Sequence, residues 1–197
     1  MSHVVLIRPG ATTYDEQNRV QGVLDLPLSE RGRAEVALLV EKLSLSPECS
    51  SLAAIYCGPG ENVVRTAECV GRVLGVRPRR IDELHNVDQG LWQGLQIDEI
   101  KRRNNRVFRQ WLEDPRTICP PQGETVEDAM ERIHSVLKPL LRRHQGDSIG
   151  LVVGEPLARF VACYLRREPR LQLDELPPCC GFERIDVTPD LIRNGLP

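Results

Sequence analysis

The sequence alternates short apolar runs with longer amphipathic segments, and this alternation constrains the fold more than any other feature. Three of the apolar runs, residues 3–7, 52–56 and 148–153, each lead into a loop that contains glycine or proline. Short apolar runs bounded in this way are typical of buried strands. Strands that alternate with helices predict an α/β layer fold with a mostly parallel sheet, whose functional loops follow the carboxyl ends of the strands. We therefore expect the segments after these three runs to form the functional site.

The amphipathic segments between these runs are expected to be helices. Ser29 and Thr125 are suitable N-cap residues, and Gly75 stands where a helix would stop. The arginine-rich segment at residues 95–112 gives a weaker helical pattern than the other amphipathic segments. The C-terminal tail is rich in proline, and we expect its short strand-like run at 182–187 to pack at the edge of the domain. The expected helices cover residues 30–43, 63–74, 95–112, 125–141 and 156–165.

Composition excludes several classes of function. The chain has 26 basic and 28 acidic residues and a formal net charge of -2, so no global field attracts nucleic acid or an anionic membrane. The 7 cysteines form no CxxC pair and no Cys/His cluster at metal-ligand spacing, which predicts reduced thiols. We expect neither a metal nor a cofactor. The N-terminal apolar run is too short for a signal peptide or a membrane span, so we expect a single cytoplasmic domain over residues 1–197.

Four stretches of the sequence carry a family resemblance. Residues 8–12 read RPGAT, residues 19–22 read RVQG, residues 25–32 read DLPLSERG, and residues 90–95 read GLWQGL. In order and spacing they resemble the motifs of the histidine phosphatase (phosphoglycerate mutase-like) superfamily, and the resemblance is clearest over residues 1–165. It implies a three-layer α/β/α fold with a mostly parallel central sheet. It also implies the activity of a phosphomonoester phosphatase or a phosphoglycerate mutase.

The position of the family's nucleophile is occupied by proline. The resemblance implies a neutral histidine that attacks phosphorus, arginines and a second histidine that hold the phosphoryl oxygens, and a carboxylate that handles the leaving-group proton. Within the triplet at residues 8–10, the nucleophile's place is taken by Pro9. The proline ring has no lone pair with which to attack phosphorus. Pro9 therefore excludes covalent catalysis of the family's kind at this position.

The other positions that the resemblance assigns to catalysis have also changed. Asn62 stands in the place of the family's second arginine and lacks its charge. Asn86 replaces the proton-donating carboxylate, and Glu155 replaces the second histidine with a group that repels phosphate. Asp15 puts an anion where the family has an asparagine. Because Arg8 alone remains of the phosphate-binding set, we expect the charge balance of the pocket to be reversed relative to the family.

We therefore predict a catalytically inactive relative whose pocket binds an unknown small polar ligand. One alternative is a phosphatase or other hydrolase that uses Glu155, Asp15 and His85 in the same cleft, and another is a protein-interaction module. A structural ion-pair cluster of Arg8, Asp15 and Glu155 would also account for these charges, without any ligand. The predicted pocket residues are Arg8, Pro9, Asp15, Gln21, Asn62, Asn86 and Glu155.

Three further features have both a functional and a structural interpretation. His85 lies close to the pocket loop in sequence and could replace the missing nucleophile, but a lone loop histidine is more often structural. Cys57 follows the second strand and is more often a small buried side chain than a reactive thiol, since nothing near it in sequence would lower its pKa. The arginines at positions 102, 103, 106 and 109 mix helix faces without stacking aromatics, which favours a solvated surface over a nucleic-acid site.

Overall fold

The computed structural model describes residues 2–47, 49, 51–171, 173, 179–188 and 191, and its centre is a five-stranded sheet. The strand order is β3-β2-β4-β1-β5, in which β1 to β4 pair in parallel and β5 runs antiparallel to β1 at one edge. The predictions of a mostly parallel sheet and of an edge strand in the tail are confirmed. The strands are β1 His3–Arg8, β2 Leu52–Cys57, β3 Pro78–Arg80, β4 Ser148–Val152 and β5 Gly181–Asp186.

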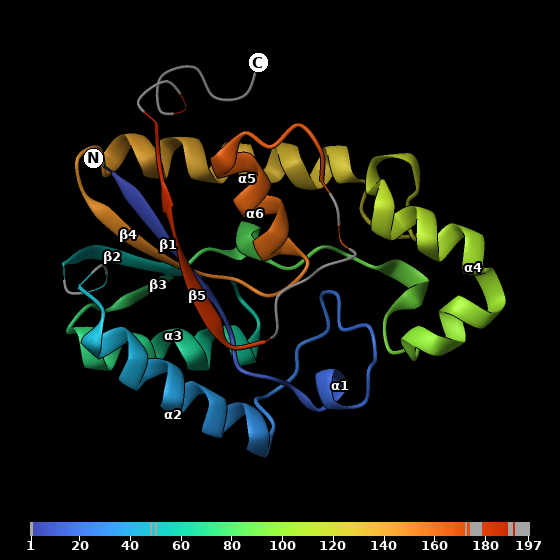
Figure 1. The fold of residues 1–197 in the computed structure, drawn as a ribbon, viewed down its shortest axis with the longest axis horizontal. Coiled ribbons are helices and arrows are strands. Elements are labelled where there is room, and N and C mark those ends of the chain that lie inside the picture. Colours follow the sequence, from blue (N-terminus) through green and yellow to red (C-terminus); the bar gives the residue numbers. More distant parts are fainter. Residues whose placement is uncertain are drawn as a thin grey trace.

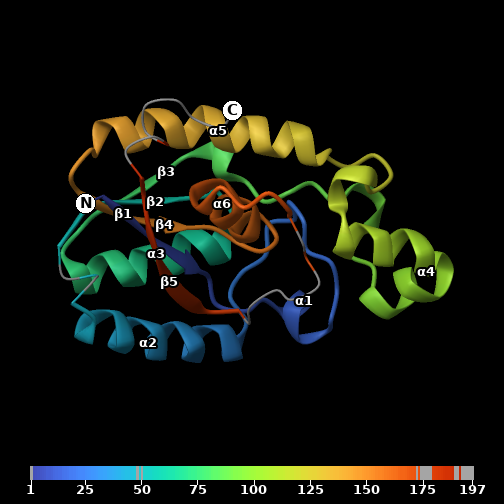
Figure 2. The same cartoon turned by 45° about the horizontal axis from the view of Figure 1, so that its top comes forward.

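Helices cover both faces of the sheet (Figure 1). Helices α2 and α3 pack on one face and α5 and α6 on the other, while α4 extends to the side, as the turned view in Figure 2 also shows. The predicted three-layer α/β/α arrangement is thus confirmed. The helices are α1 Thr13–Glu16, α2 Glu30–Leu45, α3 Glu61–Leu74, α4 Ile97–Glu113, α5 Val126–Arg143 and α6 Leu157–Arg166, with short 3-10 turns at Asp82–Leu84, Gly90–Trp92 and Pro115–Thr117.

Alternate residues of β1 face the two helical layers. Val4 and Leu6 join the hydrophobic cluster that contains the buried side chains of α5 and α6, whereas Val5 and Ile7 join the cluster of α2 and α3. All four side chains are fully buried. Because both faces of the sheet are covered, a central strand needs apolar residues at every position, which explains why β1 appears in the sequence as an uninterrupted apolar run.

The ends of the helices follow local sequence signals. The Ser29 hydroxyl accepts a hydrogen bond from the Gly32 amide at 3.0 Å, and Thr125 caps α5 in the same way. Helix α3 ends before Gly75, whose φ of 69° is the left-handed conformation that glycine adopts without strain. Within the described residues, no helix combines the length and the apolar composition needed to cross a bilayer.

The arginine-rich segment forms α4. The helix is interrupted at Asn104, whose φ of -143° and ψ of 51° are non-helical. The four arginines at positions 102, 103, 106 and 109 are exposed. Arg103 pairs with Glu99 across one turn at 2.7 Å. These features fit the interpretation as a solvated helix surface.

The loop after β1 is fixed by close contacts with α2 and α3. A Cβ atom on Gly32 would lie 2.0 Å from the Ala11 carbonyl oxygen, so only glycine lets the first turn of α2 pack against this loop. The Gly10 amide donates to the Thr66 hydroxyl at 3.2 Å, and this hydroxyl donates to the Asn62 carbonyl at 2.8 Å. The contacts place the end of β1 and the first turn of α3 side by side.

Candidate functional site

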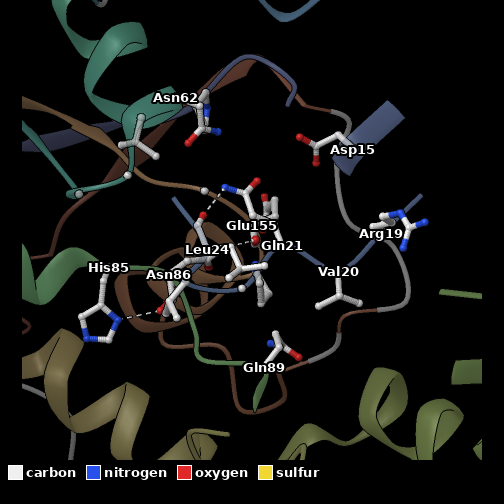
Figure 3. Close-up of a pocket in the computed structure, with 18 of the residues that line it drawn as sticks. Asp15, Arg19, Val20, Gln21, Leu24, Asn62, His85, Asn86, Gln89 and Glu155 are labelled. Atoms are coloured by element: carbon white, nitrogen blue, oxygen red, sulfur yellow. Dashed lines mark hydrogen bonds between the residues drawn. The ribbon is translucent and has the colours of Figure 1, made fainter. Parts of the chain in front are cut away.

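A pocket of about 260 Å³ opens at the carboxyl ends of β1, β2 and β4 (Figure 3). Its wall includes the loops that follow these three strands, at residues 9–10, 58–60 and 154–156. Residues 19–24 and several side chains of α4 complete the wall. The strand pattern predicted functional loops at this edge of the sheet. A pocket of this volume suits a ligand of metabolite size.

Six of the seven predicted pocket residues line this pocket. The seventh, Arg8, lies outside its wall, with its side chain buried at the end of β1. His85, the possible relocated nucleophile, also lines the pocket. The six lining residues are Pro9, Asp15, Gln21, Asn62, Asn86 and Glu155.

Arg8 is engaged by a carboxylate of the protein itself. Its Nη1 donates to Glu183 Oε1 at 2.9 Å, and Arg166 of α6 contacts the other carboxylate oxygen of Glu183. In the antiparallel register of β1 and β5, Glu183 lies on the same face as Arg8, diagonally across the two strands. The ion-pair cluster of Arg8, Asp15 and Glu155 that we considered from the sequence is therefore wrong, because the ionic partner of Arg8 is Glu183.

Pro9 follows β1 directly and forms part of the pocket wall. Its carbonyl oxygen accepts a hydrogen bond from the Cys180 amide at 2.9 Å, which ties this loop to the segment before β5. The ring nitrogen of proline is an amide nitrogen, so the side chain has no group that could attack phosphorus or carry a proton. Within the described wall, the position that the resemblance assigns to the nucleophile is therefore chemically inert.

Asn62 lies in the first turn of α3 and is 4% exposed. Its Nδ2 lies 3.5 Å from the Gly10 carbonyl oxygen as a donor. This contact fixes the direction of the amide, because the opposite orientation would place two acceptor oxygens together. Its Oδ1 accepts no hydrogen bond from the described residues. Asn62 therefore offers the pocket a neutral acceptor, where a phosphate would require a cation.

Glu155 lies in the loop between β4 and α6, and its Oε2 accepts a hydrogen bond from the Arg159 amide at 3.2 Å. Burial raises the pKa of Glu155 to about 7, and the nearby Arg8 charge opposes this effect without cancelling it. Near neutral pH, the group is therefore divided between its acid and carboxylate forms. The reversal of charge that the sequence predicts is correspondingly weaker at this position.

Asp15 completes the capping box of α1, whose N-cap is Thr12, and it also lines the pocket. Its Oδ2 accepts hydrogen bonds from the Thr12 amide at 2.6 Å and from the Thr12 hydroxyl at 2.8 Å, and Thr12 in turn caps α1. Gln21 is held in the wall by a hydrogen bond from its Nε2 to the Leu24 carbonyl at 3.2 Å. Both side chains therefore stabilise the wall segment in addition to lining the pocket.

Asn86 binds the backbone of the loop that carries Glu155. Its Nδ2 donates to the Glu155 carbonyl at 2.7 Å. Its Oδ1 accepts from the Val87 amide at 2.9 Å and from the Leu157 amide at 3.2 Å. An amide cannot donate a proton to a leaving group at neutral pH. The position that the resemblance assigns to the proton donor is thus a structural bridge between two pocket loops.

We expect Asn86→Ala to lower the free energy of unfolding by about 3 kcal/mol, because it leaves the buried Leu157 amide and the Glu155 carbonyl without these partners. Asn62→Ala is the matched control. It removes only one 3.5 Å contact and should cost less than about 1 kcal/mol. Urea unfolding followed by circular dichroism measures both values. Equal losses in the two variants would show that Asn86 does not hold the Glu155 loop.

The two nucleophiles that the sequence offers as replacements differ in the structure. Cys57 is 2% exposed, and burial raises the pKa of its thiol to about 11, so it is protonated at neutral pH. The interpretation of Cys57 as a buried structural residue is confirmed. His85 Nδ1 donates to the Asn86 carbonyl at 2.8 Å, because a carbonyl oxygen can only accept. In the neutral ring, Nε2 then carries the lone pair.

The sequence motifs did not predict the apolar part of the pocket. Both tryptophans of the chain, Trp92 and Trp111, line it with their ring centroids 6.2 Å apart, and Phe108 lies beside Trp92. Gln89 lines it too, although it is 4% exposed, and its Nε2 finds no hydrogen-bond partner in the described part of the chain. Trp111 is visible in the sequence as an apolar helix position, but only the fold shows that it shares a pocket with Glu155.

Comparisons with known proteins place these features in a family. A family model described as the histidine phosphatase superfamily (branch 1) matches residues 4–190. Phosphoserine phosphatase 1 of Hydrogenobacter thermophilus is 27% identical over 165 residues, which cover 84% of this chain and 76% of that protein. The probable phosphoglycerate mutase GpmB of Salmonella arizonae is 26% identical over 191 residues, which cover 94% of this chain and 85% of that protein.

A solved structure and the extent of the family match both support membership of the histidine phosphatase superfamily. The structure of Bacillus stearothermophilus YhfR is similar with a TM-score of 0.81 and 25% identity, and the match covers 96% of this chain and 93% of that one. Relatives from Mycobacterium bovis and Mycobacterium tuberculosis are longer, and the match covers 40% of their length. Because the family model spans most of the sequence, and the fold and motif order agree with it, the chain belongs to the histidine phosphatase superfamily.

Proposed function

We propose that this protein is a catalytically inactive member of its superfamily, whose pocket binds a small polar ligand without transferring phosphate. The observation that carries the proposal is Pro9, which lines the pocket at the position of the family's nucleophile. Loss of a covalent nucleophile alone typically reduces turnover by about 10⁶. His85 also lines the described wall and offers a nitrogen lone pair, but it lies in a different loop from Pro9.

The charges around the pocket support the same conclusion. An incoming phosphate would have to compete for Arg8 with Glu183, which already holds the guanidinium at 2.9 Å. Asn62 supplies no charge, and the ionised form of Glu155 would repel the phosphate. At an effective dielectric constant of 20, two unit charges 4 Å apart interact by about 4 kcal/mol, so an ionised Glu155 beside the phosphate would oppose the binding of a dianion.

A hydrolase with relocated groups is the second candidate, and one observation favours it. The pKa of Glu155, raised to about 7, suits a general base, and the pocket also contains His85. Such an enzyme would need a cation near the developing negative charge. The arginine of the described wall is Arg19, whose Nη1 donates to the Gly94 carbonyl, and Figure 3 shows its guanidinium directed away from Glu155. This arrangement favours binding over catalysis.

Turnover of para-nitrophenyl phosphate separates the two candidates. We expect wild-type protein and Glu155→Gln to release product at the rate of buffer alone. Glu41→Gln makes the same change on the exposed surface of α2 and serves as the matched control. Turnover that wild type and Glu41→Gln share, and that Glu155→Gln lacks, would establish the hydrolase and overturn the proposal.

A further inference from the structure

The polar half of the pocket holds hydrogen-bonding groups that the protein leaves unused. Asn62 Oδ1 and Gln89 Nε2 belong to side chains that are 4% exposed, and neither atom has a hydrogen-bond partner among the described residues. Figure 3 shows these two residues on opposite sides of the pocket, with Glu155 between them. A buried polar atom without a partner is costly, so such atoms in a pocket wall indicate the groups that a ligand provides.

The other half of the pocket is apolar and aromatic. Trp92, Trp111 and Phe108 are each less than about a tenth exposed, and Val20 and Leu24, from the segment that follows α1, line the same pocket. These rings pack against one another, so a flat apolar body would lie against the cluster and gain contact area at little entropic cost. The rings also attract a cation that lies near their faces.

The charges of the wall favour a cationic head over an anionic one. Asp15 and Glu155 contribute carboxyl groups, while the Arg19 guanidinium is directed away from Glu155. Arg8 lies outside the wall, where its Nη1 donates to Glu183, a carboxylate that Arg166 also contacts, while its Nε has no hydrogen-bond partner among the described residues. A cation beside Glu155 would favour the carboxylate form and gain a charge-assisted hydrogen bond from it.

We propose that the pocket binds a small aromatic primary amine. Its ammonium head contacts Glu155 and Asn62 Oδ1, its apolar body lies against Trp92 and Trp111, and a distal hydroxyl or carbonyl meets Gln89. This inference rests on the proposed function, because it requires the pocket to serve binding and not phosphoryl transfer.

Tyramine is a suitable probe because it has all three parts, and its hydroxyl satisfies Gln89 whichever way that amide is turned. Both tryptophans of the chain line the pocket, so tryptophan emission excited at the red edge of the absorption band reports occupancy directly. We expect tyramine to bind at least about tenfold more tightly than para-cresyl phosphate, which carries a phosphate on a similar ring. Phenethylamine, which lacks only the hydroxyl, should bind about threefold to tenfold more weakly than tyramine.

Single substitutions identify the parts of the site. Glu155→Gln preserves the size of the side chain and should weaken tyramine at least about tenfold, because it removes a charge-assisted hydrogen bond. Gln89→Leu should weaken tyramine but leave phenethylamine unchanged, so a loss specific to tyramine cannot come from misfolding. Glu41→Gln, on the exposed surface of α2, should leave both affinities at the wild-type value.

The pH dependence of binding provides an independent readout. The affinity of wild type for tyramine should rise as the pH passes upward through about 7, where Glu155 ionises. The charged groups that act on this carboxyl are Arg8 of β1, Arg159 of α6 and Glu183 of β5, and the pocket wall adds Asp15 and His85. Glu155→Gln should lose the rise, because it removes the carboxyl group that ionises in this range.

Three results would overturn the inference: no binding of tyramine, tighter binding of para-cresyl phosphate than of tyramine, or an affinity for tyramine that Glu155→Gln does not change. Each of them leaves the proposed function in place as long as phosphomonoesters are not turned over. Turnover of para-nitrophenyl phosphate removes the proposed function whatever tyramine does, so the two failures are distinguishable.

Discussion

The double substitution Pro9→His with Glu155→His should raise phosphomonoester hydrolysis at least about a hundredfold above wild type. A covalent nucleophile typically increases turnover by a factor of about 10⁶. The double variant still has Asn86 in place of a proton donor, and the lack of general acid catalysis lowers this gain by a factor of about 10² to 10⁴. The difference leaves about 10² as the smallest expected gain. Turnover of para-nitrophenyl phosphate measures it.

The matched control is Pro9→Ala with Glu155→His, which restores the second histidine without the nucleophile and should stay at the wild-type rate. Adding Glu183→Gln to the double variant removes the ionic partner of Arg8 and should lower the KM for the phosphate ester. A double variant that unfolds at the same urea concentration as wild type and still shows no gain would contradict the account. The pocket would then differ from an active one in more than its catalytic groups.

The unfolding free energy of Glu155→Gln should rise relative to that of wild type as the pH increases. The gain should reach about 3 kcal/mol on passing from a pH below about 4.5 to a pH above about 7. The pKa of Glu155 is about 7 in the folded protein and near the ordinary 4.5 in the unfolded chain. Below about 4.5, Glu155 is protonated in both the folded and the unfolded state, so it does not lower the stability of wild type. Between the two values the unfolded chain releases its proton first, and above about 7 the folded state bears the full cost of the buried carboxylate.

Urea unfolding of wild type and Glu155→Gln across this pH range measures the effect, because only the difference between the two proteins isolates Glu155. Glu41→Gln on the exposed surface of α2 should show a difference from wild type that stays constant with pH. A constant difference for Glu155→Gln would mean that the charges of Arg8 and Arg159 fully compensate the burial of Glu155.

The strands and the position of the pocket follow from local sequence because their signals are local. Val4, Val5, Leu6 and Ile7 form one apolar run, and a strand buried on both faces is what requires such a run. Ser29 and Gly75 mark helix ends through hydrogen bonds and backbone conformations that involve only neighbouring residues. Because parallel strands end at the same edge, the loops after them were expected to meet, and they line one pocket.

The ionic partner of Arg8 could not be predicted, because it lies on a strand that is distant in sequence. Glu183 is 175 residues away, and only the register of β5 against β1 brings it beside Arg8. The raised pKa of Glu155 depends on burial, which no motif encodes. The same is true of Trp111 and Gln89, which line one pocket with the loops at the carboxyl ends of the strands although they are distant from those loops in sequence.

Under the proposed function, Pro9 prevents phosphoryl transfer in this protein. The most direct test is to incubate the purified chain with radiolabelled acetyl phosphate, quench in alkali to preserve phosphohistidine, and measure the label bound per chain. The proposed function predicts no label on wild type, and label at position 9 of the variant that carries Pro9→His and Glu155→His. Acid-labile phosphate on the wild-type chain, approaching one per molecule, would contradict it.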